Sequence, residues 1–455
     1  MTTTLDRQWV ANHLSLLQHA PGRKVREVIG VLLADTVAIA SHARLGQVGG
    51  TRVDRAMVTA SADGCAVWGA DYRAAPADAA FLNGCAAEAL DFQEVLINPR
   101  NNGHAAVVII PALLALAEQR GISGERLVRA LWLAFAANIR LAEALGRGHR
   151  TGKAGFRTTS VVAPIAAALG AAALVSDDVE LALNTVAICA SSLSAGLLSS
   201  LSPQVGSYSL DKDFAVGFAA RHPVQALQLA EAGADGPRQP LTGEHGWLAS
   251  FGFGAEQPHR LSGNPLEADL GSYEIKPYPA CFGCQSAISA ALRLVERVPL
   301  QRIDSVRIEV NQGSASSLST RSITNSLAAR FSLPYAVSSA MVRRRSGLGD
   351  FEGPALADPA VQEFMRRVDL RASVELTAQQ QATGGFPAIV RVFSDGMEID
   401  QQICEGPQDG LSMAARRALF SAKIGALCPA PVAERLLALS REPERVAALL
   451  FATTP

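Results

Sequence analysis

The segment from Ser272 to Leu294 combines reactive side chains with a stiff backbone. Its sequence, SYEIKPYPACFGCQSAISAALRL, presents Lys276, Tyr278 and Cys281 around two prolines that are two residues apart. Proline fixes φ and biases the preceding residue toward an extended conformation, so these side chains project from a rigid connector. The apolar neighbours of Lys276 predict partial desolvation, which disfavours the charged ammonium and lets a lysine act as a base. A surface lysine at a domain crossing is the alternative interpretation.

Two further cationic side chains stand where helices are predicted to begin. His104 follows a polar loop and opens an apolar stretch that runs to Gln119, and Lys212 precedes a helix predicted over 213–232. The start of a helix exposes unpaired N–H groups and the positive end of the helix dipole, which favour a bound anion. Both residues are therefore candidate site residues. A histidine that only caps its helix is an equally open interpretation.

A glycine-rich basic loop lies between two predicted helices. Residues 147–159, RGHRTGKAGFRTT, carry Arg150, Lys153 and Arg157 among three glycines. Arginine binds carboxylate and phosphate groups through two parallel N–H donors, so this loop is a candidate substrate-binding segment. Its spacing matches neither a P-loop nor a dinucleotide-binding fingerprint. A solvated basic turn is the alternative.

The cysteines do not form a recognisable framework. Seven of them are scattered along the chain, which fits a reducing cytoplasm, and the first residues, MTTTLDRQWV, lack the apolar core of a signal peptide. Cys281 and Cys284 make one C-x-x-C, but no second C-x-x-C or histidine pair with ligand spacing completes a zinc site. We therefore expect no metal and no cofactor.

Composition limits the class of protein. At 455 residues the chain exceeds what one hydrophobic core usually serves, so two domains are expected. Apolar residues make up 49% and charged residues 18%, as in a soluble, helix-rich protein. The net charge is −1 without a basic block, so we expect no nucleic acid partner. The uncharged runs 158–176 and 185–210 lack interfacial anchors, and we interpret them as buried helices without a membrane role.

Periodicity divides the chain into two parts. Apolar residues recur at helical spacing over 5–18, 25–42, 75–91, 104–119, 123–145, 160–174, 177–198 and 213–232. Beyond the connector, alternation predicts strands at 303–310, 371–376 and 388–393, and a hairpin turn at Asp395-Gly396 leads into 397–403. Helices are predicted at 335–345 and 358–368, and again from Leu411 onward.

These elements predict a mostly α fold with two domains. Residues 1–270 should form an all-helical domain, completed by the helices of 406–455, and residues 271–405 an α+β domain. Because the candidate residues come from both parts, we expect the site in the cleft between the domains.

Four segments resemble the MmgE/PrpD family in sequence and in order. KPYPACFGCQSAISAAL is similar to the family's KPYP-x-C segment, LDFQEV at 90–95 to LDFDDT, HAAVVIIPALLALAE at 104–118 to HPSAPVLPAALALAE, and GFRTTSVVAPIAAALGAAAL to GFHxT with an Ala-rich helix. The family includes 2-methylcitrate dehydratase, cis-aconitate decarboxylase and iminodisuccinate epimerase. The resemblance spans most of the chain.

The resemblance implies a set of site residues. It places four side chains at the family's polar active-site positions: Asp91, His104, Lys212 and Lys276. The departures are Val95 where dehydratases and decarboxylases usually have Thr, Arg157 in place of a His, and Cys281 where the decarboxylase has another His.

The resemblance also implies the chemistry, which is abstraction of an acidic C–H proton next to a carboxylate without a cofactor. Loss of two imidazoles favours an epimerase acting on an amino- or imino-dicarboxylate such as iminodisuccinate. Its acid–base pair would come from Lys276, Cys281, His104 and Lys212, with Asp91 beside them. Substrate binding would fall to Arg157, Lys153, Arg150 and Tyr278.

Two alternatives stay open. One is a dehydratase or decarboxylase of a 2-methylcitrate-like or cis-aconitate-like tricarboxylate, and the other is a non-catalytic helical binding protein. The resemblance further implies a homodimer.

Overall fold

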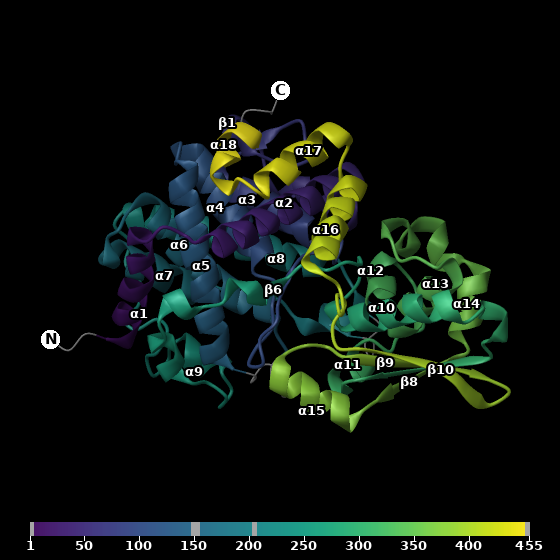
Figure 1. The fold of residues 1–455 in the computed structure, drawn as a ribbon. Helices are drawn as coiled ribbons and strands as arrows, with labels where there is room; N and C mark the ends of the chain where they lie inside the picture. The colour runs from purple at the N-terminus through teal and green to yellow at the C-terminus, as the bar shows by residue number, and fades with distance from the viewer. Residues whose placement is uncertain (1–3, 147–154, 203–206, 451–455) are drawn as a thin grey trace.

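A large helical region and a smaller region built on a sheet make up the structure, a computed structural model that describes residues 4–146, 155–202 and 207–450 (Figure 1). The predicted fold class, mostly α with a smaller α+β part, is confirmed. The larger hydrophobic core lies among the helices and the smaller one against the sheet.

Eight long or medium helices form most of the first region. They are α1 (Leu5–Leu14), α2 (Arg23–Leu45), α3 (Pro76–Glu88), α4 (Ala106–Arg120), α5 (Gly124–Leu145), α6 (Thr158–Val175), α7 (Val179–Ser191) and α8 (Asp211–Glu231). Helices α3, α4, α6 and α8 pack closely on one another. Small side chains let the helix backbones approach one another. Helix α6 comes so near to α5 that a Cβ on Gly170 would lie only 2.8 Å from the Ala134 Cβ.

Helices α2 and α6 are long and apolar enough to cross a membrane by length and composition. Their most apolar windows are 72% and 89% buried inside the chain. Packing within the helical core therefore accounts for their apolar composition.

The second region is organised around one mixed sheet in the order β10-β9-β7-β8. The strands are β7 (Ser305–Val310), β8 (Val368–Ala372), β9 (Ala388–Ser394) and β10 (Met397–Cys404). Strand β7 runs parallel to β8 and antiparallel to β9, and its side chains alternate between buried and half-buried. Asp395 and Gly396 both have positive φ in the tight turn between β9 and β10, as the sequence predicts.

Helices pack against this sheet and around it. The main ones are α10 (Phe282–Arg297), α11 (Gln312–Ser317), α12 (Ser326–Arg330), α13 (Leu333–Arg343), α14 (Pro359–Met365) and α15 (Val374–Thr383). Helix α10 follows the proline-stiffened connector and contacts β9, β10 and α13.

Several sequence-based boundaries are wrong. The strand predicted at 371–376 is β8, which ends at Ala372, because the Ser373 side chain accepts the N–H of Leu376 and starts helix α15. The helix predicted to reach residue 198 ends at Ser191 as α7, and that predicted over 358–368 ends at Met365 as α14.

The last helices return to the helical region. Helices α16 (Met413–Leu427) and α17 (Ala430–Leu439) pack on α2, and α18 (Val446–Leu449) follows them (Figure 1). Leu427, Leu436 and Leu439 belong to the larger core.

Three small antiparallel strand pairs occur in the described part of the chain, and one of them joins distant segments. Strand β1 (Ala60–Ala66) pairs with β2 (Arg73–Ala74), and β4 (Leu201–Ser202) with β5 (Ser207–Tyr208). Strand β3 (Val95–Leu96) pairs with β6 (Tyr273–Glu274), so the loop after α3 lies beside the connector before α10. This third pair connects the two regions where the candidate residues occur.

The close approach of α2 and α17 makes a glycine necessary. A Cβ on Gly30 would lie 2.8 Å from the carbonyl carbon of Ser440, which is closer than side chains tolerate. Gly30→Ala should therefore lower the melting temperature, although alanine is the better helix former by about 1 kcal/mol. Gly425→Ala in α16 is the matched control, since nothing lies within 4 Å of its Cβ. Thermal unfolding should show the control unchanged or slightly stabilised; a stabilised Gly30→Ala would contradict this packing.

Candidate active site

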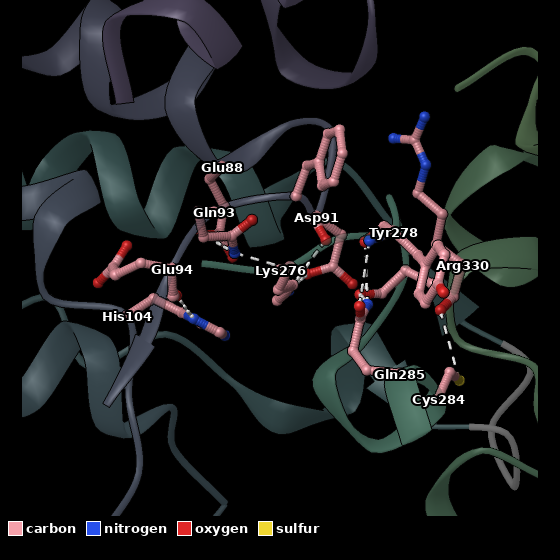
Figure 2. Close-up of polar contacts among 12 residues, drawn as sticks. Glu88, Asp91, Gln93, Glu94, His104, Lys276, Tyr278, Cys284, Gln285 and Arg330 are labelled. Carbon is pink, nitrogen blue, oxygen red and sulfur yellow. Dashed lines mark hydrogen bonds and ion pairs between the residues drawn. The ribbon is translucent and has the colours of Figure 1, made fainter. Parts of the chain in front are cut away.

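The β3–β6 pair brings an aspartate and a lysine together across 185 positions of sequence. Asp91 lies shortly before β3 and Lys276 shortly after β6, and the strands are antiparallel, so residues before one lie next to residues after the other. Lys276 Nζ lies 3.0 Å from Asp91 Oδ1 and also donates to Asp91 O at 2.9 Å (Figure 2). Both side chains are almost completely buried.

The backbone of Asp91 turns sharply to make this contact. Its φ is 49°, in the left-handed region that aspartate tolerates better than most residues. The turn directs the carboxylate toward the connector and away from α3. We take this conformation as part of the site. A left-handed backbone costs free energy in a residue other than glycine, and such residues cluster at functional sites.

A second buried cluster centres on Glu88, at the end of α3. Lys212 Nζ lies 2.7 Å from Glu88 Oε1, and an Arg157 guanidinium nitrogen lies 2.5 Å from the same oxygen. Arg157 also donates to the carbonyl oxygen of Lys212 at 2.7 Å. Because Lys212 Nζ is 4.0 Å from Asp91 Oδ1, the two clusters form one connected charge network.

The cations keep the two carboxylates ionised. Burial alone raises the pKa of a carboxyl group, but Lys212 and Arg157 outweigh it and lower the pKa of Glu88 to about 2. Burial acts in the same way on Asp91, where Lys276 and Lys212 hold the pKa well below its usual range. The network therefore carries fixed charges at neutral pH.

His104 is held as a neutral imidazole beside this network. Its Nδ1 lies 2.5 Å from the carbonyl oxygen of Glu94, which can only accept, so Nδ1 carries the proton and Nε2 is left as an acceptor. Burial and the charge of Lys276 lower the pKa of His104 to about 4. His104 also lines a small cavity of about 10 Å³, together with Asn102, Asn138 and Thr159.

Glu94 is a carboxyl group that stays protonated near neutral pH. Burial raises its pKa to about 8, although Glu94 Oε1 accepts the N–H of Ala106 at 2.8 Å. Its position fixes the start of α4 and, through its carbonyl, the ring of His104. Sequence reasoning did not identify this residue.

Cys281 lies near the Lys276–Asp91 pair, because the charges of Asp91 and Lys276 both act on its thiol. Figure 2 shows His104 and Glu94 on one side of that pair and Arg330 and Cys284 on the other. Cys281 is the residue before α10, and its N–H donates to Arg330 O at 2.9 Å. Burial, and then the charge of Asp91, raise the pKa of the Cys281 thiol to about 11, so it is protonated.

The structure places the other predicted residues as follows. Tyr278 lies on the same connector and its hydroxyl oxygen accepts from Ser289 Oγ at 3.2 Å. Arg157 is nine-tenths buried and bonded to Glu88, which differs from the expected loop arginine held ready for substrate. Arg150 and Lys153 lie outside the described residues.

Two predictions about the surroundings of Lys276 and His104 need correction. Lys276 is fully buried, although the sequence predicts a partly desolvated or surface lysine, because Asp91 supplies a carboxylate that pairs with it. His104 precedes α4, which begins at Ala106, and its ring bonds to Glu94 O.

Sequence reasoning missed Glu88, Glu94 and Arg330. Arg330 is 1% exposed and reaches from α12 to donate to the Ala89 carbonyl at 3.0 Å, so it links the two regions. A usable signal existed, because a lone charge inside an Ala-rich or apolar run is costly unless it is paired. Glu88 in AAEAL and Arg330 in LAARF both fit that description.

The C-x-x-C of Cys281 and Cys284 lies at the start of α10 without further ligands. Over residues 4–146, 155–202 and 207–450, no group of three or more His, Cys, Asp or Glu side chains is arranged to hold a metal ion. The side chains that converge are acid–base groups and cations.

Fold and site together define a mostly helical, two-part protein with a buried acid–base network where the parts meet. Two family models match it: the MmgE/PrpD N-terminal domain over residues 8–259 and the MmgE/PrpD C-terminal domain over residues 278–440. The chain therefore belongs to the MmgE/PrpD family. The second model extends through α16 and α17, and the boundaries predicted from the sequence, 1–270, 271–405 and 406–455, stay a prediction.

Two relatives of this chain are both named cis-aconitate decarboxylase. The chain is 31% identical over 192 residues to a cis-aconitate decarboxylase of Homo sapiens, covering 41% of this chain and 37% of that protein. It is 25% identical over 317 residues to the cis-aconitate decarboxylase of Mus musculus, covering 67% of this chain and 62% of that protein. The chain thus matches less than two thirds of the length of either relative.

The neutral state of His104 should make stability depend on pH. Its pKa is 6.5 in the unfolded chain and about 4 in the fold, so between these values only the unfolded state binds the proton. The stabilisation is full above pH 6.5 and is lost as the pH falls toward 4. Between pH 7 and pH 5 the protein should lose up to about 2 kcal/mol that His104→Gln does not lose.

Denaturant titrations at the two pH values measure this difference. His259→Gln, at an exposed histidine, is the matched control and should behave as the unchanged protein. An equal loss of stability in the His104→Gln variant would show that the ring is not held neutral.

Proposed function

We propose that this protein transfers a proton at a carbon next to a carboxylate of a small di- or tricarboxylate, without a cofactor. Membership in the MmgE/PrpD family supports this reaction class. The buried cations support it as well, because a carboxylate substrate and the enolate-like charge formed from it both need positive groups in a water-poor site.

The reaction that the geometry supports best is epimerisation of an amino- or imino-dicarboxylate such as iminodisuccinate. One observation carries this proposal: a proton acceptor, His104 Nε2, and a proton donor, the Cys281 thiol, both lie near the Lys276–Asp91 pair. His104 is a neutral imidazole with Nε2 as an acceptor, and Cys281 is a protonated thiol. An epimerase needs a base on one face of the reacting carbon and an acid on the other.

Each group has a defined part in this mechanism. His104 Nε2 takes the proton from the substrate carbon, and the electron pair moves into the adjacent carboxylate to give an enolate-like intermediate. Lys276, oriented by Asp91, stabilises that charge. The Cys281 thiol then delivers its proton to the opposite face, leaving a thiolate that Lys276 and Lys212 favour electrostatically. Proton exchange with water returns His104 to the neutral imidazole and Cys281 to the thiol. The reverse direction starts from the state that the forward step leaves, in which the Cys281 thiolate is the base and protonated His104 is the acid.

Decarboxylation of a cis-aconitate-like tricarboxylate is the second candidate. Both relatives are named cis-aconitate decarboxylases, which favours it. Loss of carbon dioxide leaves a carbanion that a single acid protonates, so only one of the two groups would act. This route changes the carbon skeleton, whereas epimerisation does not.

Proton NMR in heavy water separates these candidates. With an amino- or imino-dicarboxylate, epimerisation exchanges the Cα proton for deuterium and interconverts the stereoisomers without a new skeleton. With a cis-aconitate-like tricarboxylate, decarboxylation gives a product one carboxylate shorter. A protein that does neither with any tested substrate would be the non-catalytic binding protein considered above.

Single-base variants test the epimerase directly. His104→Gln should abolish interconversion but keep deuterium exchange into the one stereoisomer that Cys281 deprotonates, and Cys281→Ala should keep exchange only into the other. Separate incubation of each stereoisomer with each variant measures this complementary pattern. Loss of exchange from both stereoisomers in both variants would contradict the two-base mechanism.

Lys276 should affect turnover and stability together. Lys276→Ala removes the cation that faces the developing charge, so kcat should fall roughly 10²- to 10³-fold. It also leaves the buried carboxylate of Asp91 without its nearest partner, so the melting temperature should fall too. Lys276→Arg keeps the charge and should retain more of the rate if the role is electrostatic.

Steady-state kinetics and thermal unfolding of both variants give these values. Lys24→Ala is the control, because that lysine is exposed and its ion pair with Asp269 lies on the surface. Normal turnover by Lys276→Ala would remove Lys276 from the mechanism.

A further inference from the structure

A buried lysine of the C-terminal segment lies behind the proposed active site. Helix α16 is mostly exposed, and its buried residues are Lys423, Ile424 and Leu427. A leucine and an isoleucine at such positions only complete a core. A lysine among them has to be explained by what its ammonium contacts, because burying an unpaired charge is costly.

The ammonium of Lys423 has two carbonyl acceptors and one ion-pair partner. Nζ donates to the carbonyl oxygens of Phe92 at 2.8 Å and of Lys276 at 3.2 Å, and it lies 2.7 Å from Asp35 Oδ1 of α2. It also lies 3.9 Å from the centre of the Phe92 ring, a cation–π distance. Phe92 directly follows Asp91, so two of the three partners belong to the segments that carry the Lys276–Asp91 pair.

These two carbonyls lie where the strand pairing stops. The β3–β6 ladder pairs Val95 with Glu274 and goes no further toward the site. Continued by two residues, its register would place residue 93 opposite Lys276. Lys423 therefore bridges the two segments just beyond the last residue pair of β3 and β6. At that point the ladder supplies no donor, and backbone carbonyls need another one.

A second residue of the C-terminal segment supports the same connector. Gln408, before α16, donates to the carbonyl oxygen of Ile275 at 2.9 Å. Ile275 and Lys276 are thus both held from the C-terminal side. The segments that position the proposed catalytic groups depend on a part of the chain more than 130 residues away.

Stability alone does not explain the Asp35–Lys423 pair. Burial raises the pKa of Asp35 and lowers the pKa of Lys423, so the fold holds both groups in an environment that disfavours their charges. A buried ion pair is often no more stabilising than apolar residues of similar volume. The hydrogen bonds to Phe92 O and Lys276 O, in contrast, need a donor at this position.

We propose that Lys423, oriented by Asp35, is a positioning residue that fixes the Lys276–Asp91 pair from behind, so that the C-terminal helices complete the active site. Lys423 acts through the backbone of Phe92 and Lys276 and does not touch the substrate. Only the kinetic test of this proposal rests on the proposed function.

The test compares three variants that separate positioning from stability. Lys423→Met removes the donors and leaves Asp35 unpaired. Asp35→Leu with Lys423→Met removes the whole ion pair and leaves an apolar contact. Leu436→Ala is the matched control, since it weakens the packing of α17 on α2 and leaves the hydrogen bonds from Lys423 to Phe92 and Lys276 in place.

Hydrogen exchange measured by mass spectrometry reads positioning without any substrate. Peptides covering residues 89–96 and 273–281 should exchange several-fold faster in Lys423→Met and in the double variant. In Leu436→Ala they should exchange as in the unchanged protein, although its melting temperature falls. Unchanged exchange of both peptides in the double variant would overturn the proposal, and this result stands even if the proposed reaction fails.

Kinetics gives the second readout. In the double variant kcat should fall about 10²-fold while KM changes little, since a displacement of about 1 Å at reacting groups costs this much. Its melting temperature should recover relative to Lys423→Met, so stability and turnover separate. If kcat and slow hydrogen exchange recover in the double variant together with the melting temperature, the Asp35–Lys423 pair only stabilises the fold and the proposal is wrong. Should Lys423→Met fail to fold, the double variant alone decides the question.

Discussion

Burial of charge at the junction of the two regions is the constraint on which the structure depends. Five cations, Arg157, Lys212, Lys276, Arg330 and Lys423, are each less than one-tenth exposed. An isolated charge cannot be buried at an affordable free energy, so each cation must meet a carboxylate or carbonyl oxygens. Their carboxylate partners come from α2, α3, the loop before β3 and, as Glu352, the segment after α13. The network therefore forms only when the helical region, the connector and the C-terminal helices are all in place.

The same network separates the fixed charges from the groups that move protons in the proposed reaction. Glu88 and Asp91 have lowered pKa values because cations face them, so they orient those cations and do not titrate near neutral pH. His104 and Cys281 experience burial more than pairing, so both are neutral. Because both groups are neutral before the reaction starts, neither of them is a buried charge without a counterion. The presence or absence of a counterion thus decides which side chains are charged and which are neutral.

The sequence predicted the elements better than the contacts. Helical spacing, the Asp395-Gly396 turn and the proline connector are local signals, and the resemblance put Asp91, His104, Lys212 and Lys276 together. Pairing is not local: Glu88 is 69 residues from Arg157, so nothing near the arginine indicates that it is already bonded. Strands of two residues, such as β3 and β6, leave no periodic pattern. The pair that aligns the site was therefore invisible in the sequence.

Glu88 also changes how the basic loop is understood. An arginine at position 157 adds a positive charge, and the sequence suggested that a further substrate carboxylate would balance it. In the fold, Glu88 Oε1 is within 2.7 Å of both Lys212 and Arg157, so the protein supplies the balancing carboxylate itself. Glu88 Oε2 accepts from Gln93 at 2.7 Å, so the oxygens of this carboxylate are fully engaged. Arg157 consequently fixes Glu88 and the backbone of Lys212, and in the proposed reaction the cation next to the reacting carbon is Lys276.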